Sequence, residues 1–330
     1  MGSRTPGPAA GTELRARVAA RVEAAGYGPD DPLVVGVQPP TGPPAFLAHG
    51  RDAAGEPLGP GSVVYVASLA KQVVAACVAL LVRQGRLELT ASVTDRVPEL
   101  PAWARPVRVE HLLVHTGGLP EVCAWEDLQR AGLDRTTDGV LRALGERDGP
   151  DARPGAEHRY SNAGYVCLGL VVARAAGRPF AEVAHELVLG PLGLDGSRFW
   201  SGPDPAPPGS ARLRPEHPAP LSLGDGGLWS SAVDLLRWGS AMHRDVLGVA
   251  DLVQAPGHLD DGTALDYAGG VGVRDRAGRR LYRHGGRWGG LCAHLLRLAD
   301  DGSGFVLLAL DDDDARADAL AEGLLDELVP

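Results

Sequence analysis

Apolar residues recur along the chain with two spacings, and each spacing predicts one kind of element. Alternating or continuous apolar runs bounded by turn residues predict strands at 33–38, 45–48, 62–67, 270–275, 280–284, 290–298 and 305–310. Helical spacing predicts helices at 12–25, 68–84, 109–113, 137–144, 162–176, 180–188, 232–243 and 315–328. Strands therefore gather towards the two ends of the chain, whereas its middle is mainly helical.

This order of elements predicts an α+β fold rather than alternating βαβ units. We expect the two β-rich ends to form one antiparallel sheet, flanked by the N- and C-terminal helices, with the helical region inserted between them. The expected sheet region comprises 1–88 and 214–330, the inserted region comprises 89–213, and together they form one structural unit. The proline-rich residues 201–220 are either a linker or, as we favour, a loop lying over a site.

The helix predicted at 68–84 has a broad apolar face and a plausible C-terminal stop at Gly85. Ser68 falls in its first turn and Lys71 lies one turn later, so the two side chains share a face. The N-terminus of a helix also favours negative charge near Ser68. Lys71 is the only lysine among 32 Lys and Arg residues. Because arginine stays protonated in proteins, only the lysine is suited to accept a proton.

Composition adds limits on partners and compartment. The net charge is −10 and no basic block occurs, which argues against nucleic acids and anionic membranes as partners. The longest apolar run, 73–82, is too short to cross a bilayer, and the N-terminal segment lacks the apolar core of a signal peptide. We therefore expect a cytoplasmic protein that has no membrane partner.

The four cysteines are Cys77, Cys123, Cys167 and Cys292. They form no C-x-x-C pair, and we found none at a metal-ligand spacing beside a histidine. We therefore expect reduced, mostly buried thiols, and neither a metal nor another cofactor.

Three short clusters lie at the edges of predicted elements: Ser68-Leu-Ala-Lys71, Tyr160-Ser161-Asn162 and His284-Gly285-Gly286. In this order they resemble the signatures of the serine β-lactamases and penicillin-binding proteins, which are S-x-x-K, an S-D-N-type motif and K-T-G. The Tyr-x-Asn and His-x-Gly forms are similar to the class C β-lactamase branch, which includes D-peptidases, esterases and acyltransferases. The resemblance extends from about 33 to 311. No G-x-S-x-G stretch is present, which disfavours an α/β-hydrolase.

The resemblance implies acyl transfer through Ser68 as the nucleophile, with Lys71 or Tyr160 as its base. Asn162 would hold Lys71 and a substrate amide. The oxyanion hole would consist of the backbone N–H groups of Ser68 and Arg287.

The third cluster would form the opposite wall of the site. Gly285 and Gly286 would let a substrate backbone lie against the strand, because they carry no bulk. His284 would act as a hydrogen-bond donor or a pH-sensitive charge. Arg287 follows the motif, and we expect it to narrow the site or to recruit an anionic group. Trp288 is expected to line an acyl pocket.

Four further residues lie in or near the motifs, and their roles are less defined. Ala70 stands where the family usually has Thr, which removes a hydroxyl but neither proposed proton carrier. Trp125 and Trp229 lie close to the motifs in the sequence and either line the pocket or fill the core. His115 belongs to a family-like stretch that we interpret as structural.

The sequence predicts a serine hydrolase that cleaves an ester or amide of a small-molecule or peptide acyl substrate through a Ser68 acyl-enzyme. One alternative is a biosynthetic acyltransferase or macrocyclase that passes the acyl group to an amine or alcohol. Another is a non-catalytic binding or sensor protein of the same fold. Each residue also has a purely structural alternative: Ser68 and Asn162 as helix caps, Lys71 as a surface charge, and Tyr160 and His284 as core residues.

Overall fold

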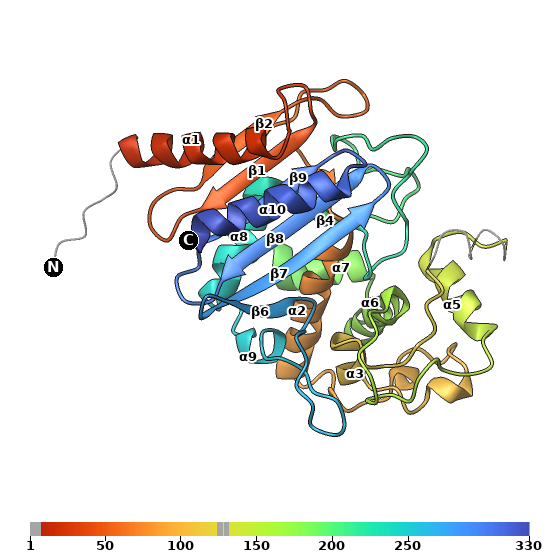
Figure 1. Ribbon diagram of the computed structural model, residues 1–330. Helices are drawn as coiled ribbons and strands as arrows, with labels where there is room; N and C mark the ends of the chain where they lie inside the picture. Colours follow the sequence, from red (N-terminus) through yellow and green to blue (C-terminus); the bar gives the residue numbers. More distant parts are fainter. Residues whose placement is uncertain (1–7, 124–127, 129–131, 330) are drawn as a thin grey trace.

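The centre of the molecule is a six-stranded antiparallel sheet in the order β2-β1-β9-β8-β7-β6 (Figure 1). The computed structural model describes residues 8–123, 128 and 132–329. The strands are β1 (Leu33–Gln38), β2 (Ala45–His49), β6 (Gly272–Arg276), β7 (Arg279–Trp288), β8 (Leu291–Leu298) and β9 (Gly304–Ala309). Because β1 pairs with β9, the two ends of the chain share one sheet, as the sequence predicts.

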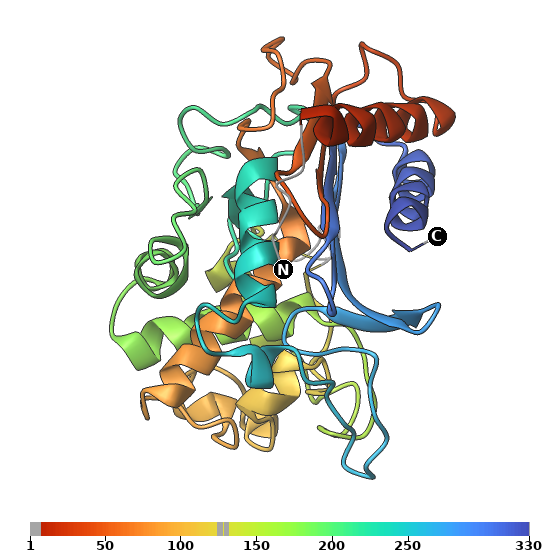
Figure 2. The same cartoon turned by 90° about the vertical axis from the view of Figure 1, so that its left-hand side faces the viewer.

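Helices cover both faces of this sheet (Figure 2). The terminal helices α1 (Pro8–Ala24) and α10 (Asp314–Leu328) lie on one face. On the other face lie α2 (Ala70–Arg83) and α8 (Ala232–His243). Every residue of β8 and β9 is buried, which explains why β9 reads as a continuous apolar run and why β8 is apolar apart from His294 and Arg297.

Further elements extend the α2 side of the molecule. Helices α3 (Val109–Leu113), α5 (Thr137–Gly145), α6 (Asn162–Ala176) and α7 (Phe180–Ala184) follow, and α7 continues into a π-helical turn at His185–Leu189. Helix α9 (Ala250–Val253) precedes β6. A second, three-stranded sheet joins β3 (Val64–Tyr65), β5 (Leu228–Ser230) and β4 (Arg198–Phe199). Three 3-10 turns span Ala67–Leu69, Val93–Asp95 and Ala102–Ala104.

The α+β fold with one antiparallel sheet and flanking terminal helices is confirmed. Several boundaries differ from the prediction by one to a few residues, and two of these differences bear on the site. The helix expected from residue 68 begins at Ala70, after the 3-10 turn, and β7 continues to Trp288. In the small second sheet, β3 falls within the strand predicted at 62–67, whereas β4 and β5 were missed because strands of two or three residues carry no readable period. The proposed division into a sheet region and an inserted helical region stays a prediction.

The proline-rich loop 201–220 lies against the end of β7. The indole Nε1 of Trp288 donates hydrogen bonds to the backbone oxygens of His217 and Pro218, at 3.1 and 3.0 Å. None of the helices in the described ranges is both long enough and apolar enough to cross a membrane.

Candidate active site

Ser68 sits in a strained turn directly before α2. The preceding residue, Ala67, has a φ of 45°, a left-handed conformation that costs a non-glycine residue roughly 1–2 kcal/mol. The turn lies against β7, where a β-carbon on Gly286 would come within 2.4 Å of the Val66 oxygen. Only glycine therefore permits this approach. Such strain is commonly retained where it positions a functional group, here the Ser68 hydroxyl.

Lys71 is fully buried, and its ammonium lies beside Ser68. Its Nζ is 3.0 Å from Ser68 Oγ, 2.9 Å from Asn162 Oδ1 and 2.7 Å from the backbone oxygen of Asp225. The Ser–x–x–Lys spacing therefore brings the two side chains into contact, as the sequence predicts. Lys71 is the second residue of α2 and is buried, so the alternative that it is a surface charge is wrong.

The three partners of Lys71 are chemically unequal. The Asn162 and Asp225 oxygens only accept hydrogen bonds, whereas the Ser68 hydroxyl can also donate. A neutral Lys71 has two N–H donors for those two acceptors, and its lone pair is then left for the Ser68 proton. A charged Lys71 donates to all three. The geometry therefore accommodates both the state before and the state after proton transfer from Ser68.

Tyr160 and Asn162 come from the segment that leads into α6. Ser161 caps this helix by accepting a hydrogen bond at its Oγ from Gly164 N, at 3.0 Å. Asn162 is the first helical residue, and its backbone N–H donates to Glu121 Oε2 at 2.9 Å. The side chain of Asn162 is left free to hold Lys71. The cap of the helix is therefore Ser161, and the alternative that Asn162 serves as the cap is wrong.

The Tyr160 ring packs near both Lys71 and His115. Lys71 Nζ lies 4.9 Å from its centre, and the His115 ring centre lies at 4.3 Å. Tyr160 is 42% exposed, so it faces solvent and is not a core residue. His115 accepts a hydrogen bond at Nδ1 from Ser161 N, and burial together with the charge of Lys71 holds its pKa well below the usual value. A neutral His115 thus holds the segment that carries Tyr160 through this hydrogen bond and through ring packing.

His284 is also a neutral residue at physiological pH. Burial and the positive charge of Lys71 lower its pKa to about 4. The Gly285 oxygen, 2.6 Å from Nδ1, only accepts, so Nδ1 carries the proton and Nε2 accepts from the Tyr267 hydroxyl at 2.9 Å. Both ring nitrogens are therefore occupied. The expectation that His284 changes its charge near neutral pH is wrong, because burial disfavours the charged form of the imidazole.

The residues of the third motif point to opposite faces of the sheet. Gly286 faces the Ser68 turn, whereas a β-carbon on Gly285 would face His294 on the other side. Arg287 also points there: its guanidinium lies 2.9 Å from Asp314 Oδ2 and 2.6 Å from Asp318 Oδ1, both on α10. The expectation that the Arg287 side chain narrows the site is therefore wrong, because successive strand residues alternate between faces.

A cavity of about 360 Å³ opens beside Ser68, within the range of small-molecule sites. As the described residues outline it, the lining comprises Tyr65, Ala67, Ser68, Glu121, Cys123, Arg135, Tyr160, Asn162, Asp225, Arg287 and Trp288. The cavity thus brings together four predicted site residues, Ser68, Tyr160, Asn162 and Trp288. Arg287 also lines it, although its guanidinium points away towards α10. Lys71 reaches Ser68 from beneath the cavity, whereas His284, Gly285 and Gly286 lie outside this lining.

The predicted tryptophans have different positions. Trp288 lines the cavity, as expected. Trp229 is 1% exposed and packs against Tyr65, with ring centres 5.6 Å apart, so it fills the core. Trp125 lies outside the described residues.

Three charged residues of the cavity, Glu121, Arg135 and Asp225, were missed from the sequence. Asp225 Oδ2 lies 3.2 Å from Arg135 Nη2, and the Arg135 guanidinium stacks over the Trp288 ring at 4.6 Å. Ser222 also donates to Asp225 Oδ1 at 2.8 Å. Asp225 falls in the stretch GDGGLWSS, whose glycine-flanked acid next to an apolar run could have drawn attention. Arg135 has no local signal, since it lies in a loop among many other arginines.

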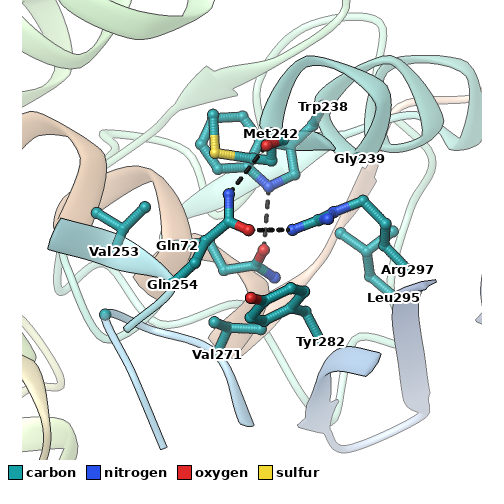
Figure 3. A pocket seen from close by; sticks show the side chains of 11 residues that line it. Gln72, Trp238, Gly239, Met242, Val253, Gln254, Val271, Tyr282, Leu295 and Arg297 are labelled. Carbon is teal, nitrogen blue, oxygen red and sulfur yellow. Dashed lines mark hydrogen bonds between the residues drawn. The ribbon is translucent and has the colours of Figure 1, made fainter. Parts of the chain in front are cut away.

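A separate, smaller cavity of about 20 Å³ lies between α2, α8 and β8 (Figure 3). Trp238 Nε1 donates to Gln72 Oε1 at 3.0 Å, and Arg297 Nη2 donates to Gln254 Oε1 at 2.9 Å. This polar network anchors the turn of α2 that also carries Lys71. None of the predicted catalytic residues lines this cavity, and its volume holds little more than one water molecule.

All four cysteines are free and buried, which agrees with the expectation of buried thiols.

Comparison with known proteins places this chain in a family. The profile of the Beta-lactamase family matches residues 35–328. The chain is 30% identical to "Esterase EstB" of Burkholderia gladioli, over 73% of this chain and 75% of that protein. It is 25% identical to "Penicillin-binding protein 4*" of Bacillus subtilis (strain 168), over 78% of this chain but only 63% of that protein, so it spans less than two thirds of this relative.

A solved structure shows the same fold. The octameric penicillin-binding protein homologue from Pyrococcus abyssi superposes with a TM-score of 0.77 at 21% sequence identity, over 96% of this chain and 77% of that one. At this identity the match concerns the fold alone. The profile match, which covers most of the chain, decides the classification: the protein belongs to the Beta-lactamase family.

Proposed function

We propose that this protein is a serine hydrolase that cleaves an ester or amide of a small-molecule or peptide acyl substrate through an acyl-enzyme on Ser68. One observation carries the proposal. The buried Lys71 Nζ lies 3.0 Å from Ser68 Oγ, while its other two partners can only accept hydrogen bonds. A lysine held in this way is a base adjacent to its nucleophile. The match to the Beta-lactamase family and the similarity to a protein named an esterase support a hydrolase.

In the first step, the Ser68 oxygen attacks the substrate carbonyl and its proton passes to Lys71 or Tyr160. The carbonyl oxygen becomes an oxyanion facing the backbone N–H groups of Ser68 and Arg287. Within the described residues the Ser68 N–H donates to no backbone carbonyl, so it is available for this role. Losing one such donor typically costs about 2.7–4 kcal/mol of transition-state stabilisation.

In the second step, the tetrahedral intermediate expels the alcohol or amine, which takes the proton back from the base. Water then attacks the acyl-enzyme, gives its proton to the same base, and releases the acid with Ser68 regenerated. Asn162 keeps Lys71 in place in both steps through the 2.9 Å contact to its Oδ1. No further group is needed to balance either step.

The cavity favours water as the acyl acceptor. Its lining includes the charged residues Glu121, Arg135 and Asp225, and Tyr160 beside Lys71 is 42% exposed. An acyltransferase protects its acyl-enzyme by excluding water, and an apolar, closed pocket would serve that purpose better. The polar lining supports hydrolysis over transfer to an amine or alcohol. It also supports a substrate with polar groups near the acyl carbon.

The test is the turnover of p-nitrophenyl butyrate by the wild type and by Ser68→Ala. We expect hydrolysis by the wild type and a rate near background for the variant. Ser240→Ala is the matched control, because Ser240 lies on α8 outside the cavity lining. Equal turnover by Ser68→Ala would contradict the proposal. Added amines that capture most of the acyl group would instead indicate a transferase, and acylation without turnover a sensor.

A further inference from the structure

Three potential metal ligands converge on the α10 face of the sheet, opposite the candidate active site. Cys292 and His294 are two residues apart on β8, so their side chains point to the same face. Asp318 reaches them from α10. Cys292 Sγ lies 3.4 Å from His294 Nε2, which lies 3.1 Å from Asp318 Oδ1, and all three atoms are within 4.8 Å of one another.

The two shorter of these separations are close to the distance between neighbouring ligand atoms in a metal coordination shell. Zinc binds Cys, His and carboxylate at about 2.0–2.3 Å, which places ligand atoms in a tetrahedron about 3.3–3.6 Å apart. The Cys292–His294 and His294–Asp318 separations, at 3.4 and 3.1 Å, are close to that distance, and the Cys292–Asp318 separation is at most 4.8 Å. Small side-chain movements would therefore bring the three donor atoms to bonding positions. A thiolate with an imidazole is the donor set that selects zinc and similar ions over magnesium or calcium.

We propose that Cys292, His294 and Asp318 bind a divalent zinc-type metal ion, with water as the fourth ligand. Cys292 and His294 are almost completely buried, which fixes their rotamers, whereas the Asp318 side chain is 49% exposed and leaves a path from solvent. Binding replaces the Cys292 S–H bond by a bond from sulfur to the metal and releases the proton to solvent. This site is independent of the acyl chemistry at Ser68.

A simpler account is an ion-pair cluster, because Arg287 also contacts Asp318 Oδ1, at 2.6 Å. That contact explains the position of Asp318 but not the contact between the Cys292 thiol and the His294 imidazole on the neighbouring strand. The charges also fit a divalent ion. Arg287, Asp314 and Asp318 together carry one negative charge, a Cys292 thiolate makes it two, and a divalent cation neutralises the cluster.

Cobalt(II) titration of tag-free, chelator-treated protein tests the site directly. We expect a thiolate-to-cobalt charge-transfer band and tetrahedral d–d bands that saturate near about one equivalent and disappear when Zn²⁺ is added. Cys292→Ala should lose the charge-transfer band, and Cys77→Ala, which removes a buried thiol elsewhere, should keep it. Far-ultraviolet circular dichroism checks that both variants are folded.

Asp318→Asn provides a second variant at a half-exposed position that tolerates substitution. It should bind Co²⁺ at least about 10-fold more weakly, since even changes outside the ligand shell have effects of that size. The absence of a charge-transfer band in the wild type would overturn the proposal. Its persistence in Cys292→Ala, or unchanged affinity in Asp318→Asn, would overturn it as well.

Discussion

The two faces of strands β7 and β8 carry different chemistry, although their residues alternate in the sequence. The face towards Ser68 holds Gly286 and the indole of Trp288, with His284 kept neutral nearby. The face towards α10 holds Arg287 with its two acidic partners, beside the Cys292 thiol. One side therefore allows close approach of the Ser68 turn, whereas the other carries charged side chains and a thiol.

The difference shows that a linear motif is not a spatial site. In His284-Gly-Gly-Arg-Trp288, successive side chains point to opposite faces of the sheet. Only every second residue of the motif can contribute its side chain to the catalytic cavity. The intervening residues can contribute only backbone groups, as proposed for the Arg287 N–H.

The largest expected effect comes from removing the proton carrier on the catalytic side. Lys71→Met should lower kcat/KM for an activated ester by about 10²–10⁴-fold, because the Ser68 proton then lacks its acceptor. Lys71→Arg should be similarly impaired, since a guanidinium stays protonated. Steady-state kinetics with a thermal melt for each variant measure this. An active Lys71→Arg enzyme would rule out Lys71 as the base and leave Tyr160.

The glycine pair compares the two faces directly. Gly286→Ala would place a β-carbon 2.4 Å from the Val66 oxygen, whereas on Gly285 the nearest contact would be an ordinary 3.6 Å. A displacement of about 1 Å at the nucleophile can cost about 100-fold in rate. We expect a loss of that size in kcat/KM for Gly286→Ala and a much smaller one for Gly285→Ala. Equal losses would show that the faces do not divide the function.

His284 should make stability depend on pH. Its pKa is about 4 in the folded protein and about 6.5 in the unfolded chain, so unfolding takes up a proton between these values. The contribution is present above about pH 6.5 and is lost as the pH falls towards 4. His284→Gln should reduce the loss of stability on this acidification by on the order of 2 kcal/mol. Urea denaturation of wild type and His284→Gln at several pH values measures this difference. If the stability of the two proteins fell in parallel with decreasing pH, the lowered pKa of His284 would be contradicted.

The smallest effect is expected from the exposed ion pairs on the α10 face. Arg287→Gln keeps the backbone N–H but loses the contacts to Asp314 and Asp318. It should cost roughly 0.2–1 kcal/mol of stability and leave ester turnover nearly unchanged. Denaturation and kinetics on the same preparation test both parts. A large rise in KM would restore the discarded idea that this side chain meets the substrate.

The sequence predicts much of the fold because long apolar patterns are local. The bounds of α3, α6, α8 and β1 agree with those predicted, and the terminal strands pair as expected. Contacts between distant segments carry no such pattern. The approach of Asp225 to Lys71 joins residues far apart in the chain, and the left-handed Ala67 is an outcome of packing against β7.

The site was partly predictable for the same reason. The spacing of Ser68 and Lys71 is local, so their contact could be expected, whereas the neutral state of His284 follows from burial by other segments. The contact of Cys292 with His294 has no distinct sequence signature, because a Cys-x-His spacing brings the two side chains to one face only when the segment is a strand. The roles of the site residues, like the cytoplasmic location and the acyl acceptor, stay predictions.

The most direct test of the central claim is the mass of the acyl-enzyme. Wild type and Ser68→Ala are mixed with a small activated ester, quenched in acid within the first turnovers and digested for peptide mass spectrometry. We expect an added acyl mass on the peptide that contains Ser68, absent in the variant and lost on longer incubation in water. An unmodified Ser68 across several acyl sizes, or the same adduct in Ser68→Ala, would contradict a serine acyl-enzyme in this protein.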